Sequence, residues 1–243
     1  LVRLEVGEAI QTWPREEIFL QSKIHPEHLG YKATKRAFEK SLQRLKTNYV
    51  DVMMLHKPWC WPGACAHEPE GTWQDSWHAL EELHVTGRAL AIGICDVDLM
   101  LLEELLQQRQ KPHIVQNWMD PFHQDKDLRR RCKEEGIQYQ AYSTLGTQWV
   151  HFRGYGQNPV LHHPTLLKLA QIYQRSVGQV VLNWALQHGV SVIPASKDEK
   201  LQRSNLQSFD FTLAPEHLAA VDALDGSLDH VDPQVVMSGW SEL

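Results

Sequence analysis

Polar side chains follow several short apolar runs of this sequence, at the points where predicted strands end. They are Lys23, His56, Cys95, Asp96, Gln116, Asn117, Ser143 and Ser196. In a barrel of parallel strands, polar residues at the carboxyl ends of the strands form the active site. A lysine ammonium stabilises negative charge, and an imidazole orients or protonates an oxygen. The simpler interpretations stay open: a surface lysine at a strand end, and a histidine that caps a strand.

A second cluster could bind a metal. His56, Cys60, Cys65 and His67 place four nitrogen or sulfur side chains in one short segment. The C-x4-C spacing is looser than in a zinc knuckle, and prolines interrupt the segment, so we weigh zinc against its absence and favour absence. The chain's four cysteines are too few for a disulfide framework at this size. We therefore predict reduced thiols.

Short β-rich runs alternate with longer stretches of helical period. The predicted strands cover residues 17–22, 50–55, 89–94, 114–117, 138–142 and 190–194. Most are apolar with little alternation, which is typical of strands covered on both faces. The predicted helices, each with an apolar stripe at three-and-four spacing, cover residues 33–45, 77–83, 101–106, 128–135, 166–173 and 177–187.

This alternation predicts the α/β class with a parallel sheet. Two architectures fit: a (β/α)8 barrel of the TIM type with its first two strands missing from this chain, and an open doubly wound sheet. The open sheet predicts a glycine-rich phosphate turn after an early strand, and no G-x-G-x-x-G occurs in the sequence. We therefore predict one barrel domain over residues 1–243.

Composition limits the classes of partner. The chain has 243 residues, 28.0 kDa and 42% hydrophobic residues, enough for one sizeable core. A formal charge of -6 with mixed signs gives no basic stripe, so we expect no nucleic acid partner. No apolar run is long enough to cross a bilayer and no leader precedes the first element, so we expect no membrane contact and a cytoplasmic location. Leu1 already opens a helix-like segment, and we expect the natural start upstream.

Many segments resemble the aldo-keto reductase family, in the family's order. They are VGEAI (6–10), EEIFLQSK (16–23), YVDVMMLHKP (49–58), GRALAIGI (87–94), AYSTLG (141–146), VGQVVLNWALQHG (177–189), VIPAS (192–196) and SNLQSFDF (204–211). The resemblance implies an NADP(H)-dependent oxidoreductase that reduces an aldehyde or ketone to an alcohol. Such enzymes use an Asp, Tyr, Lys and His tetrad, in which the tyrosine protonates the oxygen that receives negative charge.

By this resemblance Lys23 falls at the family lysine and His56 at the family histidine. The lysine lowers the pKa of the tyrosine phenol, and the histidine orients the substrate oxygen. The family tyrosine lies about six residues before the VG of VGEAI, ahead of Leu1, and the aspartate lies further upstream. The resemblance therefore gives this chain two of the four catalytic positions, and we expect impaired activity in the chain as given.

The cofactor positions are a mixture of kept and changed residues. The resemblance assigns nicotinamide and phosphate contacts to Cys95, Asp96, Gln116, Tyr142, Ser143, Leu145, Ser196 and Asn205. Cys95 and Asp96 replace a serine and an asparagine, and neither donates a hydrogen bond as those residues do. Val115 replaces the other carboxamide-binding residue. Tyr142 is either a stacking ring for the nicotinamide or a core aromatic.

At the adenine end, Ala195 and Leu201 replace a lysine and an arginine, and Ser204 replaces a glutamate. Losing two charge-assisted phosphate contacts weakens NADP(H) binding by roughly 100- to 10,000-fold. Compensation by Lys197, Lys200 or Arg203 would restore part of it and let NADH compete. In the substrate region Lys57 replaces a tryptophan, and Trp118 to Pro121 replace the family's E-x-H-P.

Three tryptophans, Trp59, Trp61 and Trp149, fall in loops after strands where the family lines its pocket. We expect Trp59 at the pocket mouth.

The sequence leaves two candidate functions. One is a carbonyl reductase acting on a small-molecule substrate. The alternative is a pseudoenzyme, a binding or scaffold protein whose exposed barrel edges a protein partner covers.

Overall fold

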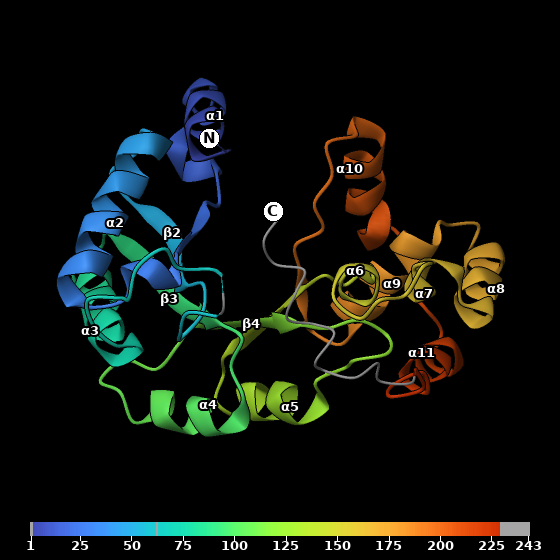
Figure 1. Cartoon of the computed structure of the whole chain (residues 1–243). Helices are drawn as coiled ribbons and strands as arrows, with labels where there is room; N and C mark the ends of the chain where they lie inside the picture. Colours follow the sequence, from blue (N-terminus) through green and yellow to red (C-terminus); the bar gives the residue numbers. More distant parts are fainter. Residues whose placement is uncertain (1, 62, 229–243) are drawn as a thin grey trace. The chain divides into compact units, whose positions relative to one another are not determined.

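In the computed structural model, residues 2–61 and 63–228 are described, and they fall into two compact units that meet in sequence at Val115 and Gln116. Helices alternate with parallel strands, as predicted, and six strands follow one another in the sheet in chain order. Figure 1 labels the helices α1 to α11 and the strands β2, β3 and β4. Among the described residues, no helix has both the length and the apolar character that a membrane crossing requires.

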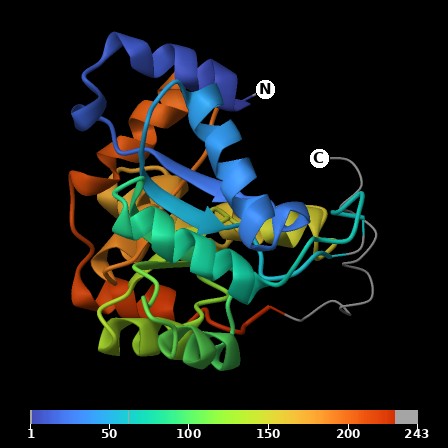
Figure 2. The ribbon, with the colours of Figure 1, turned by 90° about the vertical axis from the view of Figure 1, so that its left-hand side faces the viewer.

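The first unit contains the first three strands and their helices. Its elements are α1 (Val2–Ala9), η1 (Ile10–Thr12), η2 (Arg15–Glu17), β1 (Gln21–Ile24), η3 (Pro26–His28), α2 (Tyr31–Leu45), β2 (Val50–Leu55), α3 (Trp73–Val85), β3 (Ala89–Cys95), α4 (Leu99–Leu106) and the start of β4 (Ile114–Trp118). Helices α2 and α3 lie side by side against the strands (Figure 2). The predicted stripe of α2 is buried through Phe38, Leu42 and Leu45.

Register places the strand ends of this unit together. Strand β1 pairs with β2 so that Lys23 is opposite Met54, and β2 pairs with β3 so that Met54 is opposite Gly93. All three strands are parallel, so their carboxyl ends meet at one edge. A Cβ at Gly93 would lie 2.5 Å from the Ile114 carbonyl oxygen. Glycine is therefore required here by the close approach of a neighbouring backbone.

The second unit contains the end of β4, then α5 (Lys126–Glu134), β5 (Gln138–Tyr142), α6 (Thr147–His151), α7 (Pro159–His162), α8 (Pro164–Tyr173), α9 (Val177–Gln187), β6 (Ser191–Val192), α10 (Glu199–Leu206), η4 (Gln207–Phe209) and α11 (Pro215–Asp222). Helix α9 begins with a capping box in which Ser176 and Gln179 satisfy each other's backbone N–H groups. Trp149 and Trp184 are fully buried in its core.

The first predicted strand was misplaced. Glu17, the first residue of the predicted strand, ends a 3-10 turn over residues 15–17, and β1 begins only at Gln21. Side chains satisfy the intervening backbone, because Arg15 donates to the Ile18 carbonyl at 2.6 Å and the Leu20 N–H donates to Asp51 at 2.8 Å. The ladder therefore starts later and continues through Lys23, which lies within the strand.

The last predicted strand was too long. Only Ser191 and Val192 pair, opposite Gln140 and Ala141 of β5. Pro194 has no N–H to donate, and Ile193 is 41% exposed. The other predicted strands match the structure to within one residue at either end.

Candidate functional site

Lys23 and His56 lie at the carboxyl edge of neighbouring strands. Lys23 is the third residue of β1, and His56 directly follows β2. The His56 N–H donates to the Ile24 carbonyl at 2.9 Å, which continues the parallel ladder by one residue. The sequence-based expectation that strand ends bring these two residues together thus holds within the first unit.

The imidazole of His56 is neutral at ordinary pH. Burial lowers its pKa to about 4, and the positive charge of Lys23 acts in the same direction. The charges of Asp96, His25 and Lys57 also act on this ring, so these groups surround it. A neutral imidazole can donate one hydrogen bond to an oxygen without carrying a charge into the site.

The end of β3 adds a buried thiol and a carboxylate. Cys95 is 1% exposed, and burial raises its pKa to about 12, against the opposing effect of a hydrogen bond with Lys23. Asp96 has a φ of 56°, in the left-handed region. Its carboxylate lies 2.7 Å from the Lys57 ammonium, and both side chains are about one-fifth exposed. Asp96 therefore takes part in an ion pair at this edge.

Trp61 links these groups. The Lys57 ammonium lies 5.0 Å from the centre of the Trp61 ring. The same ring meets His56 edge-on at 6.1 Å and His25 at 5.8 Å between centroids. We call Lys23, His25, His56, Lys57, Trp61, Cys95 and Asp96 the strand-end cluster.

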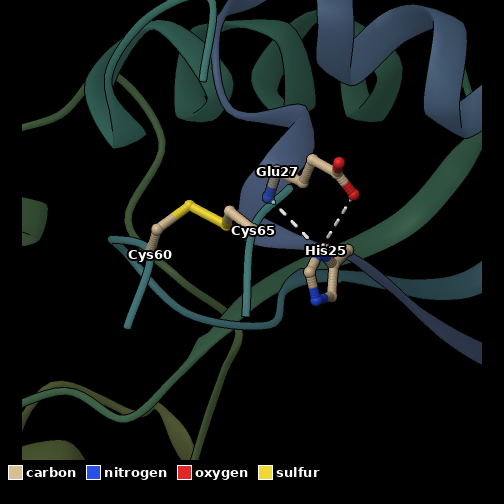
Figure 3. The surroundings of a disulfide bond; sticks show 4 residues. All are labelled: His25, Glu27, Cys60 and Cys65. Carbon is tan, nitrogen blue, oxygen red and sulfur yellow. Dashed lines mark hydrogen bonds and ion pairs between the residues drawn. A yellow bond between two sulfur atoms is a disulfide. The ribbon is translucent and has the colours of Figure 1, made fainter. Parts of the chain in front are cut away.

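The expectation of reduced thiols was wrong for one pair. Cys60 and Cys65 form a disulfide with a Cα–Cα distance of 5.9 Å, while Cys95 and Cys132 are free and buried. Figure 3 shows the disulfide with His25 and Glu27 in its surroundings. The two sulfurs are bonded to each other, so they are not thiolate ligands. No group of three or more metal-binding side chains occurs in the part of the chain that the structure describes.

In the second unit, the residues around β5 form a separate group. Gln116 is fully buried, and its amide donates to Gln140 at 2.5 Å. Tyr142 is half-buried at the end of β5. Ser143 follows with a φ of 54°, and its hydroxyl accepts a long hydrogen bond from Gln148.

Thr144 lies between two residues assigned to the cofactor. Its hydroxyl is buried without a hydrogen-bond partner, although Ser143 and Leu145 on either side are half-buried. Buried hydroxyls normally have a partner. The backbone oxygen of Leu145 accepts from Asn158 at 2.8 Å, which ties this turn to the start of α7.

The residues predicted at the adenine end lie on and before α10. The Ser196 hydroxyl accepts from the Asp198 N–H at 3.0 Å, and Asp198 caps the helix. Asn205 is half-buried, whereas Leu201 is 55% exposed. Arg203 donates twice to Glu199, at 3.0 and 2.7 Å, so its charge is already paired.

The tryptophans divide. Trp59 is 53% exposed in the loop after β2, and its place at a pocket mouth stays a prediction. Trp149 is not a loop residue but is fully buried in α6, where its indole N–H donates to Asp120 at 2.8 Å. The expectation that Trp149 lines a pocket was therefore wrong, because Asp120 fixes its ring in the core.

The first unit has a cavity of about 610 Å³ at the opposite end of its strands, lined in part by Thr47, Asn48 and Arg88. These residues precede β2 and β3. None of the site residues predicted from the sequence lines it, and in parallel α/β folds ligands bind at the carboxyl edge. We therefore place the candidate site at the strand-end cluster.

Comparison with known families decides the ancestry. A model of the aldo/keto reductase family matches residues 2–226. The chain belongs to the aldo/keto reductase family. Among curated relatives of this aldo-keto reductase, glyoxal reductase of Bacillus subtilis (strain 168) is 39% identical over 212 residues, which are 87% of this chain and 70% of that protein.

Solved aldo-keto reductases have the same fold. The Bombyx mori enzyme AKR2E4, solved in complex with NADP, is similar with a TM-score of 0.83 and 27% identity, over 95% of this chain and 77% of that one. An aldo/keto reductase from Brucella melitensis has a TM-score of 0.79 and 30% identity, over 92% and 80%. The predicted α/β class of the TIM-barrel type is thereby confirmed.

Several site groups of this aldo-keto reductase were missed from the sequence. The Lys57–Asp96 ion pair and the Cys60–Cys65 disulfide require knowledge of which loops meet. The fully buried Asp120 was noted only as part of a changed motif. The only sequence signal for its role was the presence of Trp118 and Trp149 within thirty positions, because a buried indole N–H needs an acceptor.

Proposed function

We propose that this aldo-keto reductase acts as an NADP(H)-dependent oxidoreductase that reduces an aldehyde or ketone to an alcohol. The observation that carries the proposal is a neutral, half-buried His56 beside the Lys23 ammonium at the carboxyl edge of parallel strands. A nicotinamide coenzyme, when bound, would supply the hydride. The chain's own residues have two further tasks: to orient the carbonyl oxygen and to stabilise the negative charge that develops on it.

In this proposal His56 donates a hydrogen bond to the carbonyl oxygen, and Lys23 supplies the nearby positive charge. Because the pKa of His56 is about 4, the ring stays neutral from pH 5 upward. In the family the lysine also lowers the pKa of the tyrosine phenol that acts as the acid, and the first tyrosine of this chain is Tyr31. Small carbonyl compounds are the substrate class, in line with the glyoxal reductase of Bacillus subtilis.

For the coenzyme, we propose contacts from Gln116, Tyr142, Ser143 and Leu145 in the second unit. The buried, unpartnered hydroxyl of Thr144 supports a polar ligand near this turn. Ser196 and Asn205 would complete the adenine end. The changed residues at Ala195 and Leu201, together with the Glu199–Arg203 ion pair, favour a weakened grip on a 2′-phosphate.

Turnover of glyoxal tests this function, measured on the purified chain and on the same chain extended at its N-terminus to carry the family tyrosine and aspartate. Oxidation of NADPH is followed by its absorbance, and coenzyme binding by its fluorescence. We expect His56→Gln to lower turnover by about 100-fold or more while leaving NADPH affinity within about twofold. His28→Gln, an exposed histidine on η3, is the matched control and should behave as the parent chain. Coenzyme binding without turnover of any aldehyde by the extended chain would reject the reductase.

A second candidate is a pseudoenzyme that acts as a binding or scaffold protein. The observation in its favour is the Lys57–Asp96 ion pair, because Asp96 stands where the family has an amide and its carboxylate is committed to Lys57. Failure of both NADPH and NADH to bind at millimolar concentration would support it. A protein partner at the barrel edges and a cytoplasmic location stay predictions.

A further inference from the structure

The Cys60–Cys65 disulfide lies immediately beside the strand-end cluster. Cys60 follows His56 by four residues and directly precedes Trp61. The disulfide therefore closes the short loop between Cys60 and Cys65 that contains this tryptophan. Both cysteines are half-buried. By contrast, Cys95 and Cys132 are buried and free.

Trp61 contacts the charged and aromatic members of the cluster. Its ring lies edge-on to His56 and His25, and it carries the Lys57 ammonium on its face. Lys57 in turn pairs with Asp96 at 2.7 Å. A shift of Trp61 would therefore expose His56 to water and remove the cation–π contact of Lys57.

We propose that the Cys60–Cys65 disulfide is a redox-sensitive element that positions Trp61 against His56 and Lys57. A dithiol reductant would attack one sulfur, and the S–S bond would break. Two cysteine thiols form, two protons and two electrons come from the reductant, and the reductant leaves as its own disulfide. The structural claim is independent of catalysis; its consequence for carbonyl reduction rests on the proposed function.

The environment of His56 makes the state of Trp61 measurable. The titratable and charged groups that face its ring are Lys23 on β1, His25 after β1, Lys57 after β2 and Asp96 after β3. Burial is the largest cause of its lowered pKa. When Trp61 moves away, water reaches the ring and the pKa of His56 rises toward its ordinary value.

Histidine titration by NMR tests the proposal without requiring activity. The His56 ring signal, assigned with His56→Gln, is followed from pH 3.5 to 8 before and after dithiothreitol treatment, with free thiols counted in denaturant. We expect two thiols before and four after, and a rise of at least one pH unit in the pKa of His56. His113, which lies before β4 and contacts His84, is the internal control and should not shift. Four thiols in the untreated protein would overturn the proposal.

Two variants separate positioning from a general loss of structure. Cys60→Ser with Cys65→Ser should reproduce the reduced state and should not respond to dithiothreitol. Trp61→Leu should raise the pKa of His56 with the disulfide intact, and reduction should then add less than 0.3 unit. Circular dichroism checks that each variant is folded. An unchanged pKa of His56 after verified reduction, or a full response in Trp61→Leu, would refute the role of Trp61.

If the proposed function holds, reduction should also raise the KM for glyoxal by at least threefold. If glyoxal is not turned over in either redox state, that result counts against the proposed reductase function and not against the proposed role of the disulfide. The titration of His56 would still decide whether the disulfide positions Trp61.

Discussion

Asp96 has a left-handed backbone conformation, and its side chain is held in an ion pair. Its φ of 56° lies in the left-handed region, which asparagine and aspartate tolerate better than other non-glycine residues. Its carboxylate accepts from Lys57 and cannot donate to a carboxamide. Replacement by asparagine therefore changes the hydrogen-bonding chemistry with little effect on the backbone.

We expect Asp96→Asn to tighten NADPH binding by about 3- to 10-fold, because the amide gains one hydrogen bond worth roughly 0.5–1.5 kcal/mol. Loss of the ion pair should lower the free energy of unfolding by about 1 kcal/mol or less, since both side chains are partly exposed. Fluorescence titration and urea denaturation measure the two effects. Asp127→Asn, whose carboxylate pairs with Arg130 on the exposed face of α5, is the control. Weaker binding in Asp96→Asn would contradict the assigned contact.

At the residue scale, sequence could locate Lys23 and His56 because parallel strands align their carboxyl ends whatever the loops do. It could not locate the partners of Lys57 or Cys60. Those contacts depend on how the loop after β2 folds back over β1 and β3, and no periodicity encodes a loop path. A short cysteine spacing also fits a free pair, a disulfide or a metal site.

At the scale of elements, β3 depends on one glycine. A Cβ on Gly93 would meet the Ile114 carbonyl oxygen at 2.5 Å and the Met54 methyl group at 2.9 Å. The methyl group can move, but the backbone oxygen belongs to β4 and cannot move without disturbing the sheet. Strand β3 would have to separate from β4 to accept any side chain.

We therefore expect Gly93→Ala to lower the free energy of unfolding by about 1–3 kcal/mol, the usual cost of overpacking a core. Urea denaturation followed by circular dichroism measures it. Gly156→Ala is the matched control, because a Cβ there meets nothing within 4 Å. A stability of Gly93→Ala equal to that of the control would show that the sheet can open locally.

The central strands were predictable because a short, continuous apolar run bounded by polar residues fits few structures other than a buried strand. The bounds of the first and last strands were not predictable. At β1, the side chains of Arg15 and Asp51 satisfy backbone groups that a ladder would otherwise use. At β6, Pro194 ends pairing after two residues. At β1 side-chain hydrogen bonds, and at β6 a missing backbone N–H, override the local preference for an extended strand.

Over the whole molecule, two groups whose pKa values are shifted by burial give opposite pH dependences of stability. Burial raises the pKa of Asp120 to about 7, although backbone N–H groups and the indoles of Trp118 and Trp149 donate to it and oppose the shift. His56 has its pKa lowered to about 4. Each group lies in a different unit. The pH dependence of the whole chain therefore contains two terms that partly cancel.

The signs follow from proton binding. Between about pH 4 and 7, folded Asp120 keeps a proton that the unfolded chain releases, so its contribution to stability falls as the pH rises. Between about pH 4 and 6.5, unfolded His56 takes up a proton that the folded ring refuses, so its contribution rises with pH. Each contribution changes by on the order of 2–3 kcal/mol over its range, allowing for partial solvent screening.

Variants should therefore diverge from the parent in opposite directions. Asp120→Asn should be less stable than the parent at pH 4, because its amide N–H faces an indole N–H, and the difference should shrink by about 2 kcal/mol as the pH rises to 7. For His56→Gln, the free energy of unfolding should fall relative to that of the parent by a similar amount as the pH rises from 4 to 6.5. Urea denaturation at half-unit pH intervals measures both differences. Curves that stay parallel to the parent for either variant would mean that the group does not titrate in this range, and that its charge is balanced by neighbours rather than set by burial.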